Sequence, residues 1–481
     1  MIEDPHGMAE GAAQPRRRLL LAGAAGALAA GLPQAPLHAQ PRSDRPLLFR
    51  GATLVTMEDA EGGVRRGDLL VREGRIAAIA DRIDANEAEV VAAEGDILIP
   101  GLINSHIHLG QAIIRGLSAD HTLGQYFQTV VGRYSPKLSA EDLAASDHLG
   151  ALEQIAAGVT TIFDWSREVL TPAHADAAVD AMRRAGIRAF LGYAIPGAAQ
   201  GGEAVKADIR RLLAGPLAAR DGRVRLALGL RGPDSSPPEE TLADFALAQE
   251  LGLLHQFHVG TWLYPGRRPR GVAALAASRL LTARSILVHA NELDEDEYRM
   301  VADAGAGIVV TPEVEMLMGH GQPATGRVLR GGGRPGLGVD VVTGTGGDMF
   351  TQMRMALAAQ RLADNLLARQ RREPLAAVSL TTRQVLAAAT IDAARLLGIE
   401  AEVGSLRAGK RADLVLLKGG GPATTPLHDP VGAVVMQAHP GMVDTVLIDG
   451  EPIRRDGRFL GRDIAKAAGD LQRQAESLMR R

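Results

Sequence analysis

Two histidines one residue apart, His106 and His108, have the spacing of metal ligands. Side chains of a β-strand alternate between its two faces, so residues at positions i and i+2 point the same way. The pair follows a short apolar run typical of a strand, and both imidazoles can therefore reach one ion at the end of that strand. A His-x-His pair alone also occurs by chance, so this interpretation needs further ligands.

Three later apolar runs each end in a residue that can bind a metal or a substrate. These residues are His258, His289 and Asp340. Imidazole and carboxylate groups are suitable ligands for zinc or ferrous iron, and the chain has no cysteine to supply a thiolate. Taken alone, His289 is also consistent with a hydrogen-bonded core histidine. Taken together, the pattern predicts a zinc or iron site at the strand ends.

The middle of the chain, residues 100–399, alternates apolar runs with amphipathic stretches. The runs predicted as strands are 101–106, 160–163, 189–193, 225–230, 254–258, 285–289, 307–311 and 334–339. Strands separated by helices indicate parallel βαβ units, and eight of them predict an α/β fold, a (β/α)8 TIM-like barrel. The alternative, an open doubly wound sheet, lacks the G-x-G-x-x-G segment expected after its first strand. In a barrel, the carboxyl ends of the strands form the active site.

Short β patterns also occupy both ends of the folded chain. Residues 45–99 and 400–460 contain them, and we predict that the two segments form one small β-sandwich domain. The C-terminal candidate strands are 412–417, 431–436 and 444–448, and Asp449-Gly450 is a hairpin turn signal. Residues 461–481 are predicted to form a C-terminal helix.

Residues 1–40 are predicted to be an export signal of the twin-arginine type. Arg16, Arg17 and Arg18 precede a weakly hydrophobic run, 19–32, and a small-residue stop follows near Ala39. The run is shorter than the ~20 apolar residues of a transmembrane helix, so no stable membrane insertion is expected after signal removal. We therefore expect a periplasmic or secreted protein. The alternative is a membrane-anchoring or disordered N-terminus.

The composition indicates a globular protein. Hydrophobic residues make up 46% of the 481 residues and charged residues 23%, and the net charge is −3. A nucleic-acid binder would have a basic excess, and an aromatic content of only 3% argues against stacking on single strands. No nucleic-acid partner is therefore expected. The sequence leaves a homo-oligomer open.

Four segments of the chain resemble one branch of a known superfamily. They are PGLINSHIHLGQAIIRGL (100–117), 289–310, GLGVDVVTGTGGDMFTQMR (336–354) and 404–416. They resemble the cytosine-deaminase-like and triazine-hydrolase-like branch of the amidohydrolase superfamily. The resemblance extends over about residues 47–455. It identifies the branch but does not identify a substrate. It implies a metal-dependent hydrolase.

By this resemblance, the metal ligands are His106, His108, His258 and Asp340. No lysine stands where binuclear members have a bridging carbamylated lysine, which implies a single divalent ion, zinc before iron. Asp340 would also accept the proton of the attacking water. His289 would contact the group under attack rather than the metal.

The sequence departs from this branch at two places. Members usually have His-x-x-Glu on strand five, where the Glu shuttles a proton. Here Thr261 stands in that place, and its hydroxyl does not titrate near neutral pH. After strand seven, TPEVEMLMGHG (311–321) replaces the usual Pro-x-Ser-Asn pattern. Glu315 in this segment is our candidate for the missing acid, with a solvated loop carboxylate as its alternative interpretation. Glu292, three residues after His289, is another candidate.

Several other residues close to the predicted strand ends are candidates for substrate contact. They are Gln111, Arg115, Asp164, Trp165, Glu313 and His320. Each has a structural loop contact as its alternative interpretation.

The function predicted from these residues is hydrolysis of a non-peptide C–N bond in a small N-heterocyclic substrate, with deamination favoured. A metal-activated water would attack an electrophilic carbon, and a nitrogen would leave after protonation. Ring-amide opening, or displacement of another leaving group by the same site, is the alternative reaction. A non-catalytic metal- or ligand-binding protein on this scaffold is the alternative class.

Overall fold

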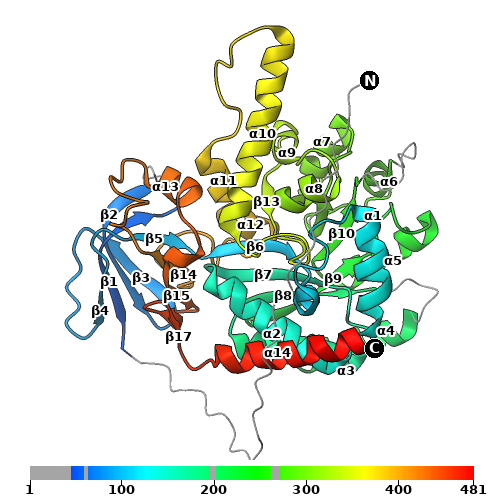
Figure 1. Cartoon of the computed structure of the whole chain (residues 1–481), viewed down its shortest axis with the longest axis horizontal. Helices are drawn as coiled ribbons and strands as arrows, with labels where there is room; N and C mark the ends of the chain where they lie inside the picture. Colours follow the sequence, from blue (N-terminus) through cyan, green and yellow to red (C-terminus); the bar gives the residue numbers. More distant parts are fainter. Residues whose placement is uncertain (1–44, 59–62, 196–201, 262–269) are drawn as a thin grey trace, which may run out of the picture. The chain divides into compact units, whose positions relative to one another are not determined.

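The computed structural model describes residues 45–58, 63–195, 202–261 and 270–481 (Figure 1). The predicted export signal, residues 1–40, lies outside the described residues. Within the described ranges, no helix is long and apolar enough to cross a membrane. The described strands form two sheets, one parallel and one mostly antiparallel.

The parallel sheet forms a barrel of eight strands, whose order in space is their order in the chain. The strands are β6 (Leu102–Ile107), β7 (Val159–Ser166), β8 (Arg188–Ala194), β9 (Val224–Leu230), β10 (His255–Val259), β11 (Ser285–His289), β12 (Gly307–Val310) and β13 (Pro335–Leu337). A bridge between Ile107 and Asp340 joins the first strand to the segment just beyond the last. The predicted (β/α)8 barrel is confirmed, and each predicted strand overlaps an observed one.

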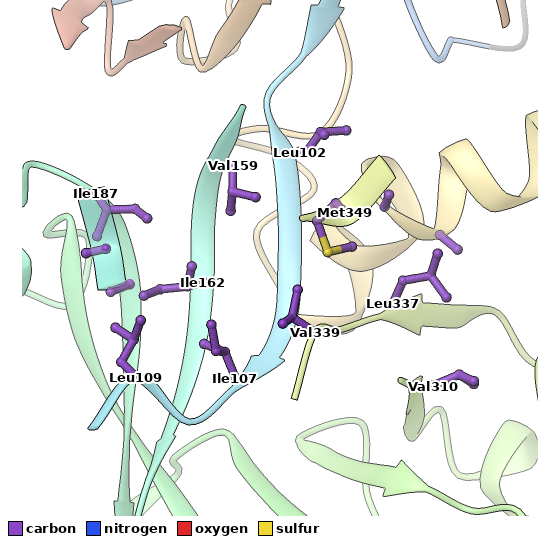
Figure 2. Packing of buried hydrophobic residues seen from close by; sticks show 14 of the residues in the cluster. Leu102, Ile107, Leu109, Val159, Ile162, Ile187, Val310, Leu337, Val339 and Met349 are labelled. Carbon is purple, nitrogen blue, oxygen red and sulfur yellow. The ribbon is translucent and has the colours of Figure 1, made fainter. Parts of the chain in front are cut away.

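Alternate residues of the barrel strands pack into two separate cores. Inward-facing side chains such as Phe163 and Phe190 pack with one another and with Leu396 from a helix that follows the barrel. Outward-facing side chains such as Ile162 and Leu337 pack in a layer with helix residues, as Figure 2 shows. Strands that are buried on both faces read as continuous apolar runs, which is why the sequence pattern located them.

Helices follow the barrel strands, and most of them lie around the outside of the sheet (Figure 1). They are α2 (Ala140–Ala156), α3 (Pro172–Ala185), α4 (Gly202–Ala214), α5 (Pro238–Leu251), α6 (Gly271–Ala277), α7 (Glu295–Asp303), α8 (Pro312–Met318), α9 (Thr325–Arg330), α10 (Met349–Arg371), α11 (Thr382–Ala388) and α12 (Ile391–Leu396). Between β6 and α2, short helical turns include Leu109–Ile114, α1 (Leu123–Tyr126) and Phe127–Tyr134. These turns begin directly after the His106–His108 pair, so they lie at the same end of the barrel as the candidate ligands.

The two ends of the described chain meet in a nine-stranded sheet. Its strands are β1 (Leu47–Val55), β2 (Val64–Arg72), β3 (Arg75–Ala80), β4 (Glu89–Ala92) and β5 (Ile97–Pro100) from the N-terminal part, and β14 (Leu414–Leu417), β15 (Val443–Ile448), β16 (Glu451–Arg455) and β17 (Arg458–Phe459) from the C-terminal part. Antiparallel pairing of β5 with β14, with Leu98 opposite Leu416, joins the two parts. The hairpin turn predicted at Asp449-Gly450 is present, and both residues have positive φ. A small β domain built from both chain ends is therefore confirmed.

The strand predicted at residues 431–436 is wrong, because this segment is helix α13 (Pro430–Met436). Asp429 caps the helix, since its Oδ1 accepts a hydrogen bond from the Val431 amide at 3.0 Å. Pro430 occupies the first turn, where its missing N–H is not needed. The last helix, α14 (Ile464–Arg480), lies within the segment predicted as helical.

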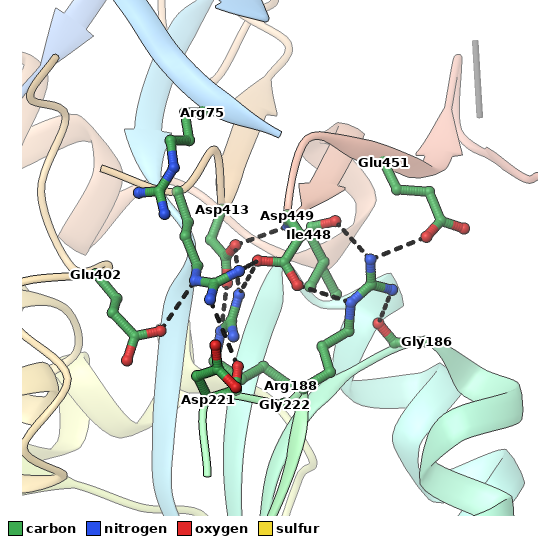
Figure 3. A network of polar contacts seen from close by, with 12 residues as sticks. Arg75, Gly186, Arg188, Asp221, Gly222, Glu402, Asp413, Ile448, Asp449 and Glu451 are labelled. Atoms are coloured by element: carbon green, nitrogen blue, oxygen red, sulfur yellow. Dashed lines mark hydrogen bonds and ion pairs between the residues drawn. The ribbon is translucent and has the colours of Figure 1, made fainter. Parts of the chain in front are cut away.

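A buried ion-pair network joins the barrel to the β domain (Figure 3). The guanidinium of Arg188 donates to both oxygens of Asp413 at 3.0 Å and to Asp449 at 2.6 Å. Asp449 also pairs with Arg223 and Arg411, each at 2.9 Å. Arg188 is the first residue of β8, so the network lies at the barrel end opposite to the candidate ligands. Its role is therefore structural, since removing one partner would leave a buried charge uncompensated.

Candidate metal centre and active site

The structure brings the four predicted ligands together at the carboxyl ends of barrel strands. One ligand atom from each of His106, His108, His258 and Asp340 lies within 4.8 Å of the others. Asp340 Oδ1 is 3.2 Å from His106 Nε2 and 3.3 Å from His108 Nε2. Tetrahedral zinc bonds of ~2.1 Å place ligand atoms roughly 3.4 Å apart, so the residues present fit a zinc ion. The same donor set also suits ferrous iron.

Groups behind the ligands fix the ring nitrogen that two of the histidines present. His106 Nδ1 donates to Gln256 Oε1 at 2.9 Å, and His108 Nδ1 donates to the backbone oxygen of Trp165 at 2.7 Å. Each Nε2 is then left with a free lone pair toward the site, as in most metal-binding histidines. Gln256 was not predicted as a site residue, although its place two residues before His258 on β10 puts both on one strand face.

The backbone at Asp340 closes the barrel and directs the carboxylate toward the other ligands. Its amide donates to the carbonyl of His106 at 3.0 Å, and the amide of His108 donates to the carbonyl of Asp340 at 2.9 Å. Asp340 has a φ of 67° and His289 a φ of 73°, both in the left-handed region that non-glycine residues rarely adopt. Such strained residues concentrate at functional sites, where the surrounding structure holds them in place.

Burial keeps these ligands in the protonation states that bind metals. Desolvation lowers the pKa of His106 to about 4 and that of His258 well below its usual value, so both imidazoles are neutral. Burial opposes the ionisation of Asp340, but the neighbouring imidazoles of His106 and His108 hold its pKa well below the usual range. These groups therefore need not lose a proton when a cation binds.

His289 lies beside the four ligands rather than among them. Its Nε2 is 3.9 Å from Asp340 Oδ2, and its ring centroid is 5.4 Å from that of His258. Its other nitrogen, Nδ1, lies 2.9 Å from the hydroxyl of Thr311. Burial lowers the pKa of His289 to about 4, so a neutral imidazole faces the carboxylate. This place suits a residue that contacts the reacting group.

Glu315 lies behind His289, on the Nδ1 side of the ring. Its Oε1 is 3.3 Å from His289 Nδ1 and accepts a hydrogen bond from the Thr311 amide at 2.8 Å. The side chain is fully buried, which excludes a solvated loop carboxylate, and burial raises its pKa to about 7. Direct protonation of a leaving group requires a position at the barrel mouth. The observed position instead lets Glu315 act through His289.

His320 packs its ring edge against His289 from the loop that follows α8. The ring centroids are 4.6 Å apart and the rings are nearly perpendicular, at 86°. The side chain is buried, and neither ring nitrogen has a hydrogen-bond partner among the described residues. Buried polar atoms without a partner are uncommon in proteins. His320 is therefore well placed to contact a bound substrate.

Two residues predicted as substrate contacts are bonded within the protein. The side-chain amide of Gln111 donates a hydrogen bond through Nε2 to the hydroxyl of Tyr126 at 2.9 Å, and both side chains are buried. Asp164 Oδ1 accepts a hydrogen bond from the Leu109 amide at 2.9 Å, directly after the ligand His108. Asp164 therefore orients the end of the ligand-bearing strand, whereas Gln111 and Tyr126 form a pair beside the site.

Two further candidates are bonded to neighbouring helices. Glu313 accepts a hydrogen bond from the side chain of Gln352 at 2.8 Å and so ties α8 to α10. The guanidinium of Arg115 forms two hydrogen bonds of 2.7 Å with Glu153 on α2. For both residues, the structure favours the loop-contact alternative.

Trp165 lies directly against the ligand histidines. Its ring centroid is 5.6 Å from that of His108 and 5.0 Å from that of His258. Gly229 on β9 makes room for it, because a Cβ there would lie 2.7 Å from the indole. The predicted contact residue therefore lines the space next to the ligands.

The model of the amidohydrolase family matches residues 97–453, which include all four candidate ligands. The chain belongs to the amidohydrolase family. The superfamily indicated by the sequence resemblance is therefore confirmed. With deaminase-named relatives over most of its length, this amidohydrolase is a metal-dependent hydrolase that acts on carbon–nitrogen bonds.

Curated relatives of this amidohydrolase are named as deaminases. A 5-methylthioadenosine/S-adenosylhomocysteine deaminase of Symbiobacterium thermophilum is 28% identical over 446 residues, which cover 90% of this chain and 99% of that protein. One of the same name in Haloarcula marismortui is 30% identical over 410 residues, covering 82% and 90%. A 5'-deoxyadenosine deaminase of Methanothermobacter thermautotrophicus is 29% identical over 408 residues, covering 83% and 91%.

Solved structures share the fold of this amidohydrolase. An adenosine deaminase from Xanthomonas campestris with bound zinc has a TM-score of 0.78 and 23% identity, covering 92% of this chain and 100% of that one. An atrazine chlorohydrolase from Arthrobacter aurescens in complex with zinc has a TM-score of 0.78 and 23% identity, covering 89% and 100%. At this identity, the likeness establishes the barrel and its β domain.

Proposed function

We propose that this amidohydrolase deaminates a small amino-substituted N-heterocycle with one zinc ion held by His106, His108, His258 and Asp340. In this reaction water is consumed, the amino group leaves as ammonia, and the ring carbon gains the carbonyl oxygen. One observation carries the proposal. Asp340 contacts two ligand histidines through Oδ1 and approaches His289 through Oδ2, so a carboxylate base and a neutral imidazole share one site. The deaminase names of the relatives support the same reaction class.

A divalent ion, when bound, lowers the pKa of its water from about 15.7 to about 7, which supplies a nucleophile at neutral pH. The ionised Asp340 accepts the proton that this water releases. Because the Nδ1 of His289 faces Glu315, Nδ1 holds a proton and Nε2 remains an acceptor toward Asp340. His289 can therefore take up a proton at Nε2 and pass it to the departing nitrogen, in place of the absent strand-five acid.

Glu315→Gln is expected to lower kcat by about 10- to 100-fold, the usual effect of losing a group that orients a site residue. Zinc content and KM should stay near the parent values, because Glu315 touches neither the ligands nor the substrate space directly. Steady-state kinetics with elemental analysis measures both. A Glu315→Gln enzyme with the parent's kcat would show that Glu315 does not position His289.

The same substitution is expected to stabilise the fold at alkaline pH. The pKa of Glu315 is about 7 in the native state and ordinarily 4.5. Between these values the unfolded chain loses a proton that the native state keeps, so the parent loses stability as the pH rises from about 4.5 to 7. Gln cannot ionise, so the Tm gain of Glu315→Gln over the parent should be larger at pH 8 than at pH 4.5. An equal Tm difference at both pH values would contradict a pKa of about 7 for Glu315 in the native state.

A second candidate reaction displaces a leaving group other than ammonia, such as chloride, from an electron-poor ring. Thr261 in place of the usual acid favours it, because a group that departs as an anion needs no proton. The atrazine chlorohydrolase shares the fold. Opening of a ring amide would use the same attack and the same ligands.

A substrate panel separates these reactions. Zinc-loaded protein is incubated with aminated purines, pyrimidines and triazines, their chlorinated analogues and cyclic amides, while ammonia, chloride and ultraviolet absorbance are followed. We expect ammonia from at least one amino-heterocycle and no release after chelation. Chloride without ammonia would favour the second candidate. Full zinc occupancy without any turnover would favour a non-catalytic binding protein.

We also propose that the protein is exported through the twin-arginine route to the periplasm or beyond. The run of Arg16, Arg17 and Arg18 before an apolar segment supports this proposal. Replacing Arg16, Arg17 and Arg18 together with Lys is expected to keep the protein in the cytoplasm. Unchanged export of that variant would contradict the proposal.

A further inference from the structure

Arg167 stands at the carboxyl end of β7, above the indole of Trp165. Phe163 and Trp165 belong to the inward-facing core, and Arg167 continues the same two-residue alternation just beyond the strand. Its guanidinium carbon lies 4.9 Å from the centroid of the Trp165 ring. That indole contacts the ligands His108 and His258, so Arg167 lies close to the candidate ligands.

The guanidinium of Arg167 has neither an ion pair nor a hydrogen bond within the described part of the chain. Its Nε is buried without a partner, and only its backbone amide is bonded, to the Trp165 carbonyl at 3.1 Å. Other arginines, such as Arg188 and Arg115, form ion pairs, with Asp413 and Glu153 respectively, although Arg188 also has one buried nitrogen, Nη1, without a partner. A buried donor without a partner requires a specific explanation.

Tyr126 lies close to both Arg167 and Asp340. Burial raises the pKa of the Tyr126 hydroxyl, and the charge of Asp340 raises it further, while that of Arg167 lowers it. The Tyr126 hydroxyl is paired with Gln111, whereas the Nε of Arg167 has no partner among the described residues.

We propose that Arg167 is a substrate-binding residue that recognises a carboxylate on the heterocyclic substrate. The inference rests on the proposed function and narrows its substrate to amino-substituted heteroaromatic carboxylates. The guanidinium carbon lies over the Trp165 ring, and the guanidinium N–H groups have no partner among the described residues. Their fork matches the two oxygens of a carboxylate.

An anionic group fits this place better than a neutral one. Arginine stays protonated in proteins, and a substrate bound over the ligands would remove water from its guanidinium. A neutral carbonyl would leave that charge without a counter-ion, whereas a carboxylate would neutralise it and accept two hydrogen bonds. Arg167 was not predicted as a site residue, although it lies two residues after Trp165.

The test compares two ligands that share a pyridine ring, nicotinate with a carboxylate and 3-acetylpyridine with a neutral ketone. Neither has an amino group to release, so calorimetric titration of zinc-loaded protein measures binding alone. The variants are Arg167→Gln, which removes the charge, and Arg167→Lys, which keeps it without the fork. Arg133→Gln is the matched control, because Arg133 stacks on Tyr134 at 5.3 Å but is exposed.

The parent and Arg133→Gln are expected to bind nicotinate about tenfold or more tightly than 3-acetylpyridine, as a charge-assisted pair implies. Arg167→Gln should lose this preference, and Arg167→Lys should keep part of it. Every variant should bind as much zinc as the parent. The proposal is overturned if Arg167→Gln keeps the preference, or if the parent binds neither ligand or both equally. Deamination in the substrate panel does not depend on these results, so a failure here is distinguishable from a failure of the proposed function.

Discussion

His106→Ala and His258→Ala are expected to purify without stoichiometric zinc and without hydrolytic activity. In the proposed site each imidazole supplies one of the four donors, and Asp340 is the one carboxylate of this set that can balance a divalent charge. With only three donors left, the zinc ion dissociates into solvent. The water that the ion would activate is lost with it. Elemental analysis after dialysis measures the zinc content. Turnover of a substrate identified in the panel measures the hydrolytic activity.

His255→Ala is the matched control for the ligand variants. His255 is three residues before His258 on the same strand and is also buried, at 2% exposure. Its Nε2 lies 2.9 Å from the hydroxyl of Ser285, so its loss should lower Tm but leave zinc bound. Near-stoichiometric zinc with full turnover in His106→Ala would show that the ligand assignment is wrong.

His289→Ala is expected to keep zinc and to lose a factor of roughly 10² to 10⁴ in kcat, the usual effect of removing a positioned acid–base group. Its Nε2 lies 3.9 Å from Asp340 Oδ2, close enough to exchange protons across a substrate but outside the ligand set. KM should change much less than kcat, because the main loss is in the proton transfer. Steady-state kinetics with elemental analysis measures all three quantities.

Rescue distinguishes a chemical role of His289 from a structural one. Imidazole added to His289→Ala should restore part of the rate, since the truncated side chain leaves room for a free ring. Thr311→Val, which removes the hydroxyl 2.9 Å from His289 Nδ1, should reduce kcat less than His289→Ala does. Loss of zinc from His289→Ala would instead place His289 among the ligands.

The barrel could be predicted because its strands are buried on both faces and end in polar residues. β11 has the bounds that the apolar run predicts, and His289 ends it. The last strand was less predictable, since only Pro335–Leu337 pairs regularly and the chain then reaches Asp340 through a bridge to Ile107. That closure depends on contacts between residues far apart in the sequence, which a local pattern does not contain.

Residues 431–436 show where local patterns fail. A six-residue apolar run fits a strand or a buried helix equally well, and only the cap at Asp429 and the proline after it distinguish them. The ligands were easier to identify, because strand alternation alone places His106 and His108 on one face.

The position of Glu315 relative to His289 could not be predicted from the sequence. The sequence places Glu315 after strand seven but does not show on which side of the His289 ring it lies. Helix α8 begins immediately after β12, and its first turn brings the Glu315 amide to the Thr311 carbonyl at 3.1 Å. This turn directs the carboxylate to the Nδ1 side of His289 and changes its proposed role from proton donor to positioning residue.

The central claim is that this chain binds one zinc ion through His106, His108, His258 and Asp340. A crystal of the zinc-loaded protein, with anomalous data collected on both sides of the zinc edge, tests it directly. We expect one strong peak per chain, about 2.0–2.2 Å from the three histidine nitrogens and from a carboxylate oxygen of Asp340. No peak at this place, or a peak whose ligands exclude Asp340, would contradict the claim.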